Sequence, residues 1–259
     1  MSCSLWLRWL WLSLGLGYLL IPLAGVAEFS LRLRRGVYSF DAYQAVLADP
    51  QFQATFLYSA VLALAAVALA VLLVVPAAYI VHLRLPAFRP VLEFVTLLPL
   101  VVPAIVIVFG YFRLYGSNSW IALTNWEAGT NLLLTCGYAT LALPYLYRAV
   151  DTGLTAIDVR TLTEAAESLG ASPLRILVSV ILPNIRAALL SGAFLTVAIV
   201  LGDFTFASLL DRPAFGPYMQ LLGANRAYEP AALSVIAFVL TWALMALIGV
   251  FGQTRTKSR

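Results

Sequence analysis

The chain has 259 residues, of which 62% are hydrophobic and 11% are charged, and its formal net charge is +4. Soluble domains carry about 25% charged residues, so this composition excludes an ordinary soluble domain and indicates an all-α membrane protein with several spans. The chain has no Walker-type phosphate loop, so we expect it neither to bind nor to hydrolyse ATP. With no cluster of ligand residues either, we expect no cofactor to be bound by this chain. Its basic residues lie between apolar stretches and form no single basic face, so we expect no nucleic-acid partner.

Six apolar stretches reach the length of about 20 residues that a helix needs to cross the hydrocarbon of a bilayer. The first is longer than the apolar core of a signal peptide, which has about 7–15 residues. It also carries Trp6, Trp9 and Trp11 at one end, as an interfacial belt does, so we expect a retained span and not a cleaved leader. The sequence therefore predicts a single transmembrane domain over residues 1–259, with spans at about 5–27, 55–81, 91–112, 131–150, 187–210 and 231–252.

The third stretch contains the sequence LPLVVP, with Pro99 and Pro103 four residues apart. Each proline removes one helical hydrogen bond, and freed carbonyls persist in a membrane only where protein or a watery cavity satisfies them. Two interpretations stay open at this point: a kink that serves helix packing, and a bend that lines a transport path.

The connection after the fourth span, residues 151–186, combines charge with turn signals and is expected to form two short helices. Thr161 and Glu164 fit a capping box at the start of the first helix. Gly170 fits the left-handed residue that ends it, and Ser172 followed by a proline fits the start of the second. The first helix carries an apolar stripe at helical spacing, made of Leu162, Ala165, Ala166 and Leu169. Such a stripe either lies on the membrane surface or docks into another protein.

The residues Glu164-Ala165-Ala166, Gly170 and Leu182-Pro183 resemble, in order and spacing, the EAA loop of importer-type ABC transporter permeases. One position departs from the family pattern, because Val180 stands where isoleucine is usual. In that family this cytoplasmic loop seats in a cleft of the ATP-binding subunit. The resemblance therefore implies that the ATPase-coupling residues are Glu164, Ala165, Ala166, Leu169, Gly170, Leu182 and Pro183.

The distribution of Lys and Arg predicts which side of the membrane this loop faces. With the N-terminus inside, ten basic residues lie on the cytoplasmic side and six on the outer side, although Arg32, Arg34 and Arg35 argue for the reverse. This interpretation puts the 151–186 loop and both chain termini in the cytoplasm, in a multi-pass protein of the cell inner membrane.

Asp203 is an acidic residue deep in a predicted span, and intramembrane carboxylates are costly enough to suggest a function. Gly192, Thr196 and Asp203 share one helical face, which either lines a transport path or packs on a neighbouring helix. The candidate translocation path thus comprises Asp203, Thr196, Gly192, Pro99 and Pro103. No nucleophile stands with a base and no metal ligands share a face, so we do not expect an enzyme.

The resemblance implies the permease subunit of an ATP-driven importer that works by alternating access. The implied partners are two ATP-binding subunits that hold ATP and magnesium, a second permease chain (identical or related), an external solute-binding protein, and membrane lipid. The segment LGDFTFASLL is similar to permeases for polyamines, ferric iron, thiamine and phosphonates, and the best overall resemblance is to spermidine/putrescine permeases. The alternative from another class is a stand-alone secondary transporter or channel, in which Asp203 would be the coupling-ion site.

Overall fold

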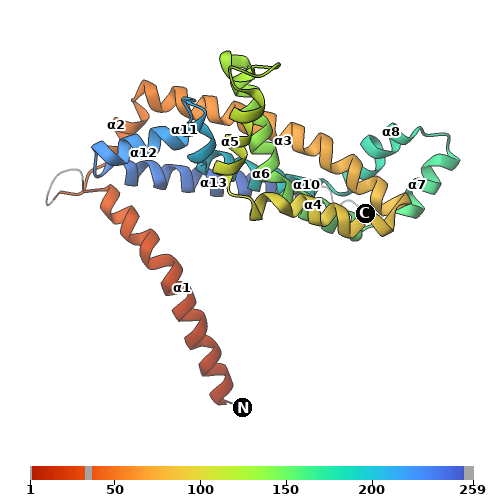
Figure 1. The fold of residues 1–259 in the computed structure, drawn as a ribbon. Helices are drawn as coiled ribbons and strands as arrows, with labels where there is room; N and C mark the ends of the chain where they lie inside the picture. The colour runs from red at the N-terminus through yellow and green to blue at the C-terminus, as the bar shows by residue number, and fades with distance from the viewer. Residues whose placement is uncertain (1, 33–36, 254–259) are drawn as a thin grey trace. The chain divides into compact units, whose positions relative to one another are not determined.

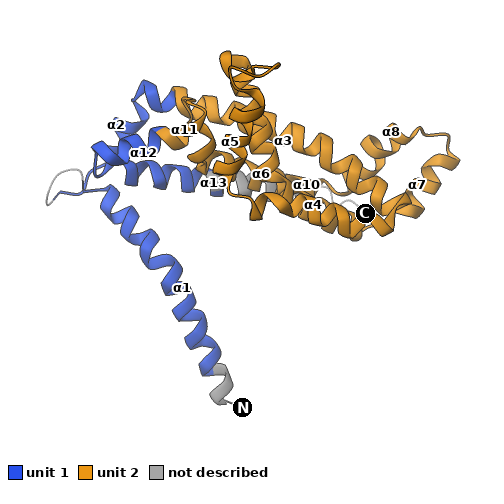
Figure 2. Ribbon diagram, in the orientation of Figure 1, with its two compact units in different colours: residues 1–53, 218–242 blue, residues 54–217, 243–259 orange. Residues whose placement is uncertain are grey.

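The computed structural model describes residues 2–32 and 37–253, and the regular elements in these ranges are helices. Figure 1 shows them along the chain. The chain divides into two compact units, residues 1–53 with 218–242 and residues 54–217 with 243–259 (Figure 2). The longer helices are α1 Ser2–Ser30, α3 Pro50–Arg84, α4 Arg89–Val101, α5 Ala104–Tyr115, α6 Glu127–Thr155, α7 Val159–Ser168, α10 Arg186–Gly202, α12 Phe215–Asn225 and α13 Glu229–Gln253. Shorter elements are α2 Asp41–Leu47, η1 Pro86–Phe88, η2 Leu123–Asn125, α8 Pro173–Ile176, η3 Leu177–Ile181, α9 Leu182–Asn184 and α11 Thr205–Leu209.

The first unit combines polar contacts between its helices with a few buried apolar residues. Ser30, the last residue of α1, lies with its Oγ 2.6 Å from the hydroxyl of Tyr43 in α2. Tyr218 of α12 donates a hydrogen bond of 2.9 Å to the carboxylate of Asp49. The most apolar window of α1 has no buried residue. The unit also buries apolar residues inside its helices, among them Val46, Phe52 and Leu233.

The second unit is built around α6. Its residues Tyr138 and Leu146 are completely buried, and α10 packs along it. At Gly192 of α10 a Cβ atom would stand 2.7 Å from Leu146 Cδ1 and 3.1 Å from Ala149 Cβ. Small residues of this kind let two helix backbones approach closely, which is how helices associate in lipid. The α6–α10 pair is thus a tightly packed framework for the rest of the unit.

Within the described residues, two helices are long and apolar enough to cross a membrane, over Trp6–Ser30 and Pro50–Arg84. The count rises to four if each of two sharply bent pairs is one span. α6 has a sufficient length of 29 residues but is more polar. The chain is therefore an all-α, polytopic membrane protein, and its division into six spans stays a prediction. The bent pairs are Pro86–Val101 with Ala104–Tyr115, and Pro173–Asn184 with Arg186–Gly202.

The predicted third span is broken, and a simple kink does not describe it. α4 ends at Val101, and the next residue, Val102, has an extended backbone with φ −83° and ψ 117°. α5 begins after Pro103 at an angle of 95° to the helical segment before it. A residue before proline is pushed toward extended conformations, and the proline has no N–H to continue the helix. Pro99, in contrast, is accommodated inside α4.

The predicted fifth span also ends earlier than its apolar composition indicates. α10 stops at Gly202, and Asp203 has an extended backbone with φ −77° and ψ 128°. The five-residue helix α11 follows as a separate element. Asp203 therefore lies at a helix break and not in the middle of a continuous helix.

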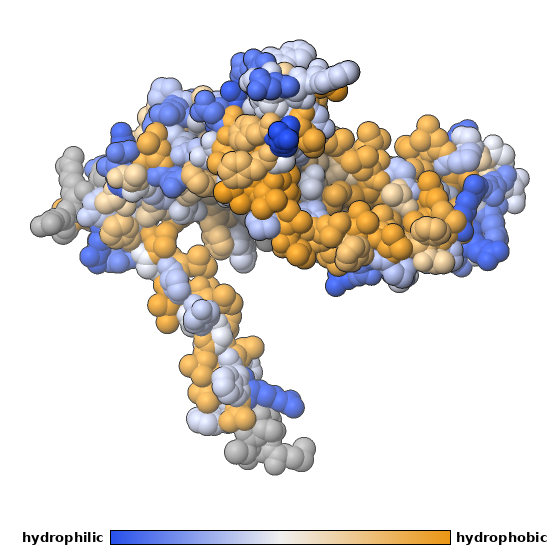
Figure 3. Space-filling view, viewed as in Figure 1, coloured by the Kyte–Doolittle hydropathy of each residue, from blue (hydrophilic) through white to orange (hydrophobic). Residues whose placement is uncertain are grey.

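Polar side chains gather at the ends of the second unit, while its helices are covered by apolar ones. In Figure 3 the apolar colour covers α3, α4 and α5, and the hydrophilic colour is concentrated around α7 and around the loop that precedes α6. Such a surface fits helices in lipid with their connecting loops in water. The α7 end is the one that carries the predicted coupling loop.

Candidate coupling and transport sites

The helix α7 is anchored along one face and open along the other. Leu162 is half-buried, whereas Ala165 is exposed and Leu169, just beyond the helix, is 89% exposed. The predicted apolar stripe is therefore divided, because Leu162 and Ala166 belong to the anchored face and the other two belong to the open face. The buried residues of the anchored face are Val159, Thr163 and Ala166.

The start of α7 differs from the predicted capping box. The helix begins at Val159, and the carboxylate of Asp158 accepts a hydrogen bond of 3.0 Å from the backbone N–H of Thr161 and one of 2.7 Å from its hydroxyl. The backbone hydrogen bond is the main reason that the pKa of Asp158 lies below its ordinary value. Thr161 is therefore the donor partner of the cap, and the prediction that it caps the helix is wrong. Glu164 is left free to pair with Arg160, at 2.8 Å.

The turn after α7 follows the sequence prediction closely. Gly170 has φ +77°, which confirms the left-handed residue at the end of the helix. Ser172 precedes α8 with an extended backbone, and Pro173 occupies the first turn of that helix. Leu182 is half-buried and Pro183 is exposed in α9, directly after the π-helical segment η3. A proline in this place removes a helical hydrogen bond, and the chain then turns by 81° into α10.

A buried hydrogen bond fixes α7 to α3. The hydroxyls of Tyr79 and Thr163 are 3.0 Å apart, and both residues are buried. Thr163 already donates its hydroxyl proton to the carbonyl of Val159 at 2.7 Å, so Tyr79 is the donor in this pair. Because a buried polar group without a partner costs about 1–3 kcal/mol, this bond ties the anchored face of α7 to the long helix beneath it.

A cluster around Asp151 was missed by the sequence reasoning. Arg89, the first residue of α4, makes two hydrogen bonds to the Asp151 carboxylate of α6, at 3.1 and 2.8 Å. His82 near the end of α3 places its Nε2 3.4 Å from Asp151 Oδ1. Three helices therefore meet at one carboxylate whose side chain is 16% exposed.

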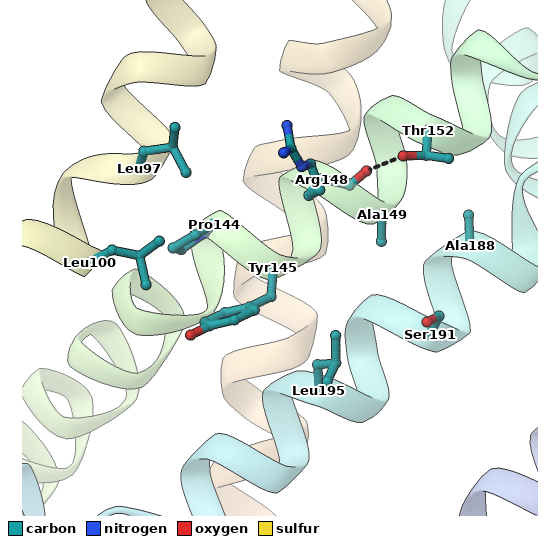
Figure 4. A pocket seen from close by; sticks show the side chains of 10 residues that line it. All are labelled: Leu97, Leu100, Pro144, Tyr145, Arg148, Ala149, Thr152, Ala188, Ser191 and Leu195. Carbon is teal, nitrogen blue, oxygen red and sulfur yellow. Dashed lines mark hydrogen bonds between the residues drawn. The ribbon is translucent and has the colours of Figure 1, made fainter. Parts of the chain in front are cut away.

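An open cavity of about 510 Å³ lies between α4, α6 and α10. Figure 4 shows Leu97 and Leu100 on one side, the α6 residues in the middle, and the α10 residues on the other side. Arg148 is its charged lining residue, and its guanidinium lies 3.1 Å from Glu93 Oε1, one turn before Leu97. The lining is mainly apolar with a few hydroxyl groups, and consists of Leu97, Leu100, Pro144, Tyr145, Arg148, Ala149, Thr152, Ala188, Ser191 and Leu195.

The five residues predicted for the translocation path do not line this cavity. Gly192 and Thr196 are buried where α10 packs in the core, and the Thr196 hydroxyl donates to the Gly192 carbonyl at 2.9 Å. Asp203 uses its Oδ2 to accept from the backbone N–H groups of Phe206 and Ala207, at 3.0 and 3.3 Å, as the cap of α11. Pro99 and Pro103 flank the α4–α5 break, on the same segment as the cavity residue Leu100. Their part in transport stays a prediction.

The family of this chain follows from its match to the sequence model of a known protein family. Residues 75–259 match the model described as "Binding-protein-dependent transport system inner membrane component", which covers more than half of the chain. The chain belongs to this family. It is an importer-type ABC transporter permease, and the resemblance found in residues 164–183 is confirmed at the level of the family.

Similar proteins serve chemically different solutes. The permease is 29% identical to the sulfate transport system permease protein CysW of Synechocystis, over 81% of this chain and 77% of that protein. It is 27% identical to the putrescine transport system permease protein PotI of Escherichia coli, over 76% of this chain and 74% of that protein. A bacterial alginate ABC transporter, solved in complex with an alginate-bound periplasmic protein, shares the fold, with a TM-score of 0.71 at 14% identity over 97% of this chain and 96% of that one.

No metal-binding group of three or more His, Cys, Asp or Glu side chains exists in the part of the permease that the structure describes. The polar features described above are the partly exposed helix α7, the three-helix ionic cluster at Asp151 and the open cavity beside Arg148.

Proposed function

We propose that this permease forms one half of the pore of an ATP-driven importer and receives force from an ATPase through α7. The observation that carries the proposal is the divided surface of α7, with one face fixed by the buried Tyr79–Thr163 hydrogen bond and one face exposed at Ala165 and Leu169. A helix that must transmit a push needs a rigid attachment beneath it and an open surface above it. The charged residue Glu164 borders that open face.

The proposed assembly has two ATP-binding subunits, a second permease chain that is identical or related, and an external solute-binding protein. ATP and magnesium are bound by the ATPase subunits and not by this chain. Both termini and the 151–186 loop lie in the cytoplasm. ATP closes the ATPase dimer, the coupling helices move together, and the pathway opens outward to receive the solute before hydrolysis resets it.

The substrate proposal has two classes. A polyamine is favoured by the similarity to the putrescine permease, and the resemblance of LGDFTFASLL adds ferric iron and thiamine as cationic candidates and phosphonate as an oxyanion candidate. A small oxyanion is favoured by the similarity to the sulfate permease and by Arg148, whose positive side chain lines the cavity between α4, α6 and α10. Competition for uptake by putrescine and by sulfate, measured in cells with the complete system, separates the two classes.

The decisive experiment is purification of the tagged protein in detergent from its native membrane, with partners identified by mass. An ATPase is expected to copurify and to be lost from the Gly170→Asp variant, because an aspartate at φ +77° disturbs the turn and adds charge beside the docking face. A second permease chain in the same complex supports the half-pore. Recovery of this chain alone, with uptake intact in liposomes that lack any ATPase, would mean that it is a secondary transporter.

A further inference from the structure

Three helices of the second unit are tied together by Asp151 at the end where α7 is attached. The α7 anchor, Tyr79, is followed three residues later on α3 by His82, so both face the same side of that helix. His82 approaches Asp151 of α6, and Asp151 is held in turn by Arg89 of α4. Two sets of polar contacts, joined by the α3 helix between Tyr79 and His82, thus link α7 to the first residue of α4.

Asp151 and its neighbour Thr155 hold the start of α4 to α6 through several hydrogen bonds. The two Arg89 nitrogens contact different carboxylate oxygens, and Arg89 Nη2 also lies 3.3 Å from the hydroxyl of Thr155 one turn further along α6. Such forked pairs add geometric specificity to the attraction. His82 Nδ1 lies 3.0 Å from the carbonyl of Ala78, and its Nε2 faces Asp151 Oδ1 at 3.4 Å without a hydrogen bond.

The contact between Arg89 and Asp151 affects the cavity, because α4 carries both Arg89 and part of the cavity wall. Arg89 starts α4, Leu97 and Leu100 on the same helix line the cavity, and the helix ends at the break before Pro103. A displacement at Arg89 therefore moves one wall of the cavity. The 95° break lets α4 move while α5 keeps its own direction, because no helical hydrogen bond continues through Pro103.

We infer that Asp151 is a positioning residue that transmits the movement of the docking helix α7 to α4, and thereby to the cavity wall at Leu100. The inference rests on the proposed function, because it assumes that an ATPase moves α7. It adds a specific route, α7 to α3 to Asp151 to α4, that the coupling loop alone does not contain.

The test uses the complete complex purified from its native membrane, with Leu100→Cys introduced as a reporter on the cavity wall. The labelling rate of this cysteine by a polar maleimide is compared with and without ATP, magnesium and vanadate, and protein without the added cysteine gives the background from Cys3 and Cys136. Asp151→Asn is expected to reduce the nucleotide-dependent change in labelling about tenfold, a typical size for coupling between sites. The ATPase should still copurify, and Asp151→Glu should restore most of the change.

Glu93→Gln is the matched control. It breaks the Glu93–Arg148 pair, which joins the same two helices, but the side chains of that pair are 44% and 74% exposed. Exposed pairs contribute little, so this variant should respond to nucleotide as the parent does. Arg89→Gln removes the same ion pair by changing its more exposed partner. This variant should lose the nucleotide-dependent change as Asp151→Asn does, and it provides the test if Asp151→Asn fails to assemble.

The inference is overturned if either Asp151→Asn or Arg89→Gln, assembled with the ATPase, keeps the full nucleotide-dependent change. It is also overturned if Glu93→Gln loses the change to the same extent, because the ionic cluster would then have no special role. Absence of any copurifying ATPase from the parent complex defeats the proposed function itself. A parent complex that holds ATPase but shows no nucleotide response defeats the transmission route.

Discussion

The α6–α10 pair and the α7–α9 loop are held in place by different combinations of contacts. Between α6 and α10 the contact is close packing, with Gly192 against Leu146 and Ala149. Around α7 the buried apolar residues Val159 and Ala166 are joined by polar contacts, the Asp158 cap and the Tyr79–Thr163 hydrogen bond, and much of the helix remains exposed. Lipid offers no hydrophobic drive for helices to associate, so the pair depends on shape, whereas the loop in water can expose a face to a partner.

The largest effect is expected from Gly192→Val, which tests the packed side of this comparison. The added side chain would collide with Leu146 and Ala149, and overpacking costs about 3 kcal/mol, at the upper end of the usual range. The midpoint of thermal unfolding in detergent should fall clearly. The matched control is Gly110→Val, because a Cβ at Gly110 meets nothing within 4 Å. Equal midpoints for the two variants would show that the pair is not tightly packed.

The next effect is expected from Glu164→Lys, on the open side. Reversing the charge beside the exposed Ala165 should leave the protein inserted but lower transport-linked ATP hydrolysis about tenfold, the size of a typical coupling term. Arg160→Gln is the control, since it removes the exposed ion-pair partner of Glu164 and keeps the carboxylate. Normal solute-stimulated hydrolysis in Glu164→Lys would refute the docking role of this face.

A smaller effect is expected from Gly170→Ala. The left-handed backbone at φ +77° costs a residue with a Cβ about 1 kcal/mol, although there is open space around the position. The loss should appear as weaker retention of the ATPase on washing, with little change in the unfolding midpoint of the membrane helices. Gly202→Ala is a suitable control, because it also faces open space and has no positive φ.

Asp203 offers a test between a structural cap and a charge on the transport path. As the cap of α11, it should tolerate Asn, while Ala should cost about 1 kcal/mol. If Asp203 instead binds a cation on the transport path, Asp203→Asn and Asp203→Ala should lower uptake equally, because both remove the carboxylate. Uptake by Asp203→Asn at the parental rate, with Asp203→Ala less stable, would assign the residue to the cap alone.

The smallest effect is expected from the pH dependence of the α7 cap. The pKa of Asp158 is lowered in the folded protein, so its contribution to stability is present at neutral pH and is lost only as the pH falls through that lowered value. Retention of the ATPase should therefore be unchanged by this group between about pH 6 and 8. A loss within that window that disappears in Asp158→Asn would contradict the assignment of the cap.

The local signals of the coupling loop were readable because each depends on neighbouring residues. Gly170 needs no tertiary contact to prefer a left-handed turn, and Ser172-Pro173 starts a helix wherever it occurs. The error at Thr161 has the same origin, since two overlapping cap patterns were present and Asp158, three residues earlier, formed the cap. The Asp151 cluster could not be read, because Arg89 and Asp151 are 62 residues apart and nothing local pairs them.

The sequence by itself determined the helical, membrane-embedded class, the family pattern in residues 164–183 and the turn at Gly170, because hydropathy and backbone preference are local properties. Only the tertiary structure decided which face of α7 is free, that α4 and α5 meet at 95°, and that Gly192 and Thr196 are buried beside α6. Those features depend on which helices touch. In a chain that is apolar almost everywhere, hydropathy does not say which side of a helix meets protein and which meets lipid.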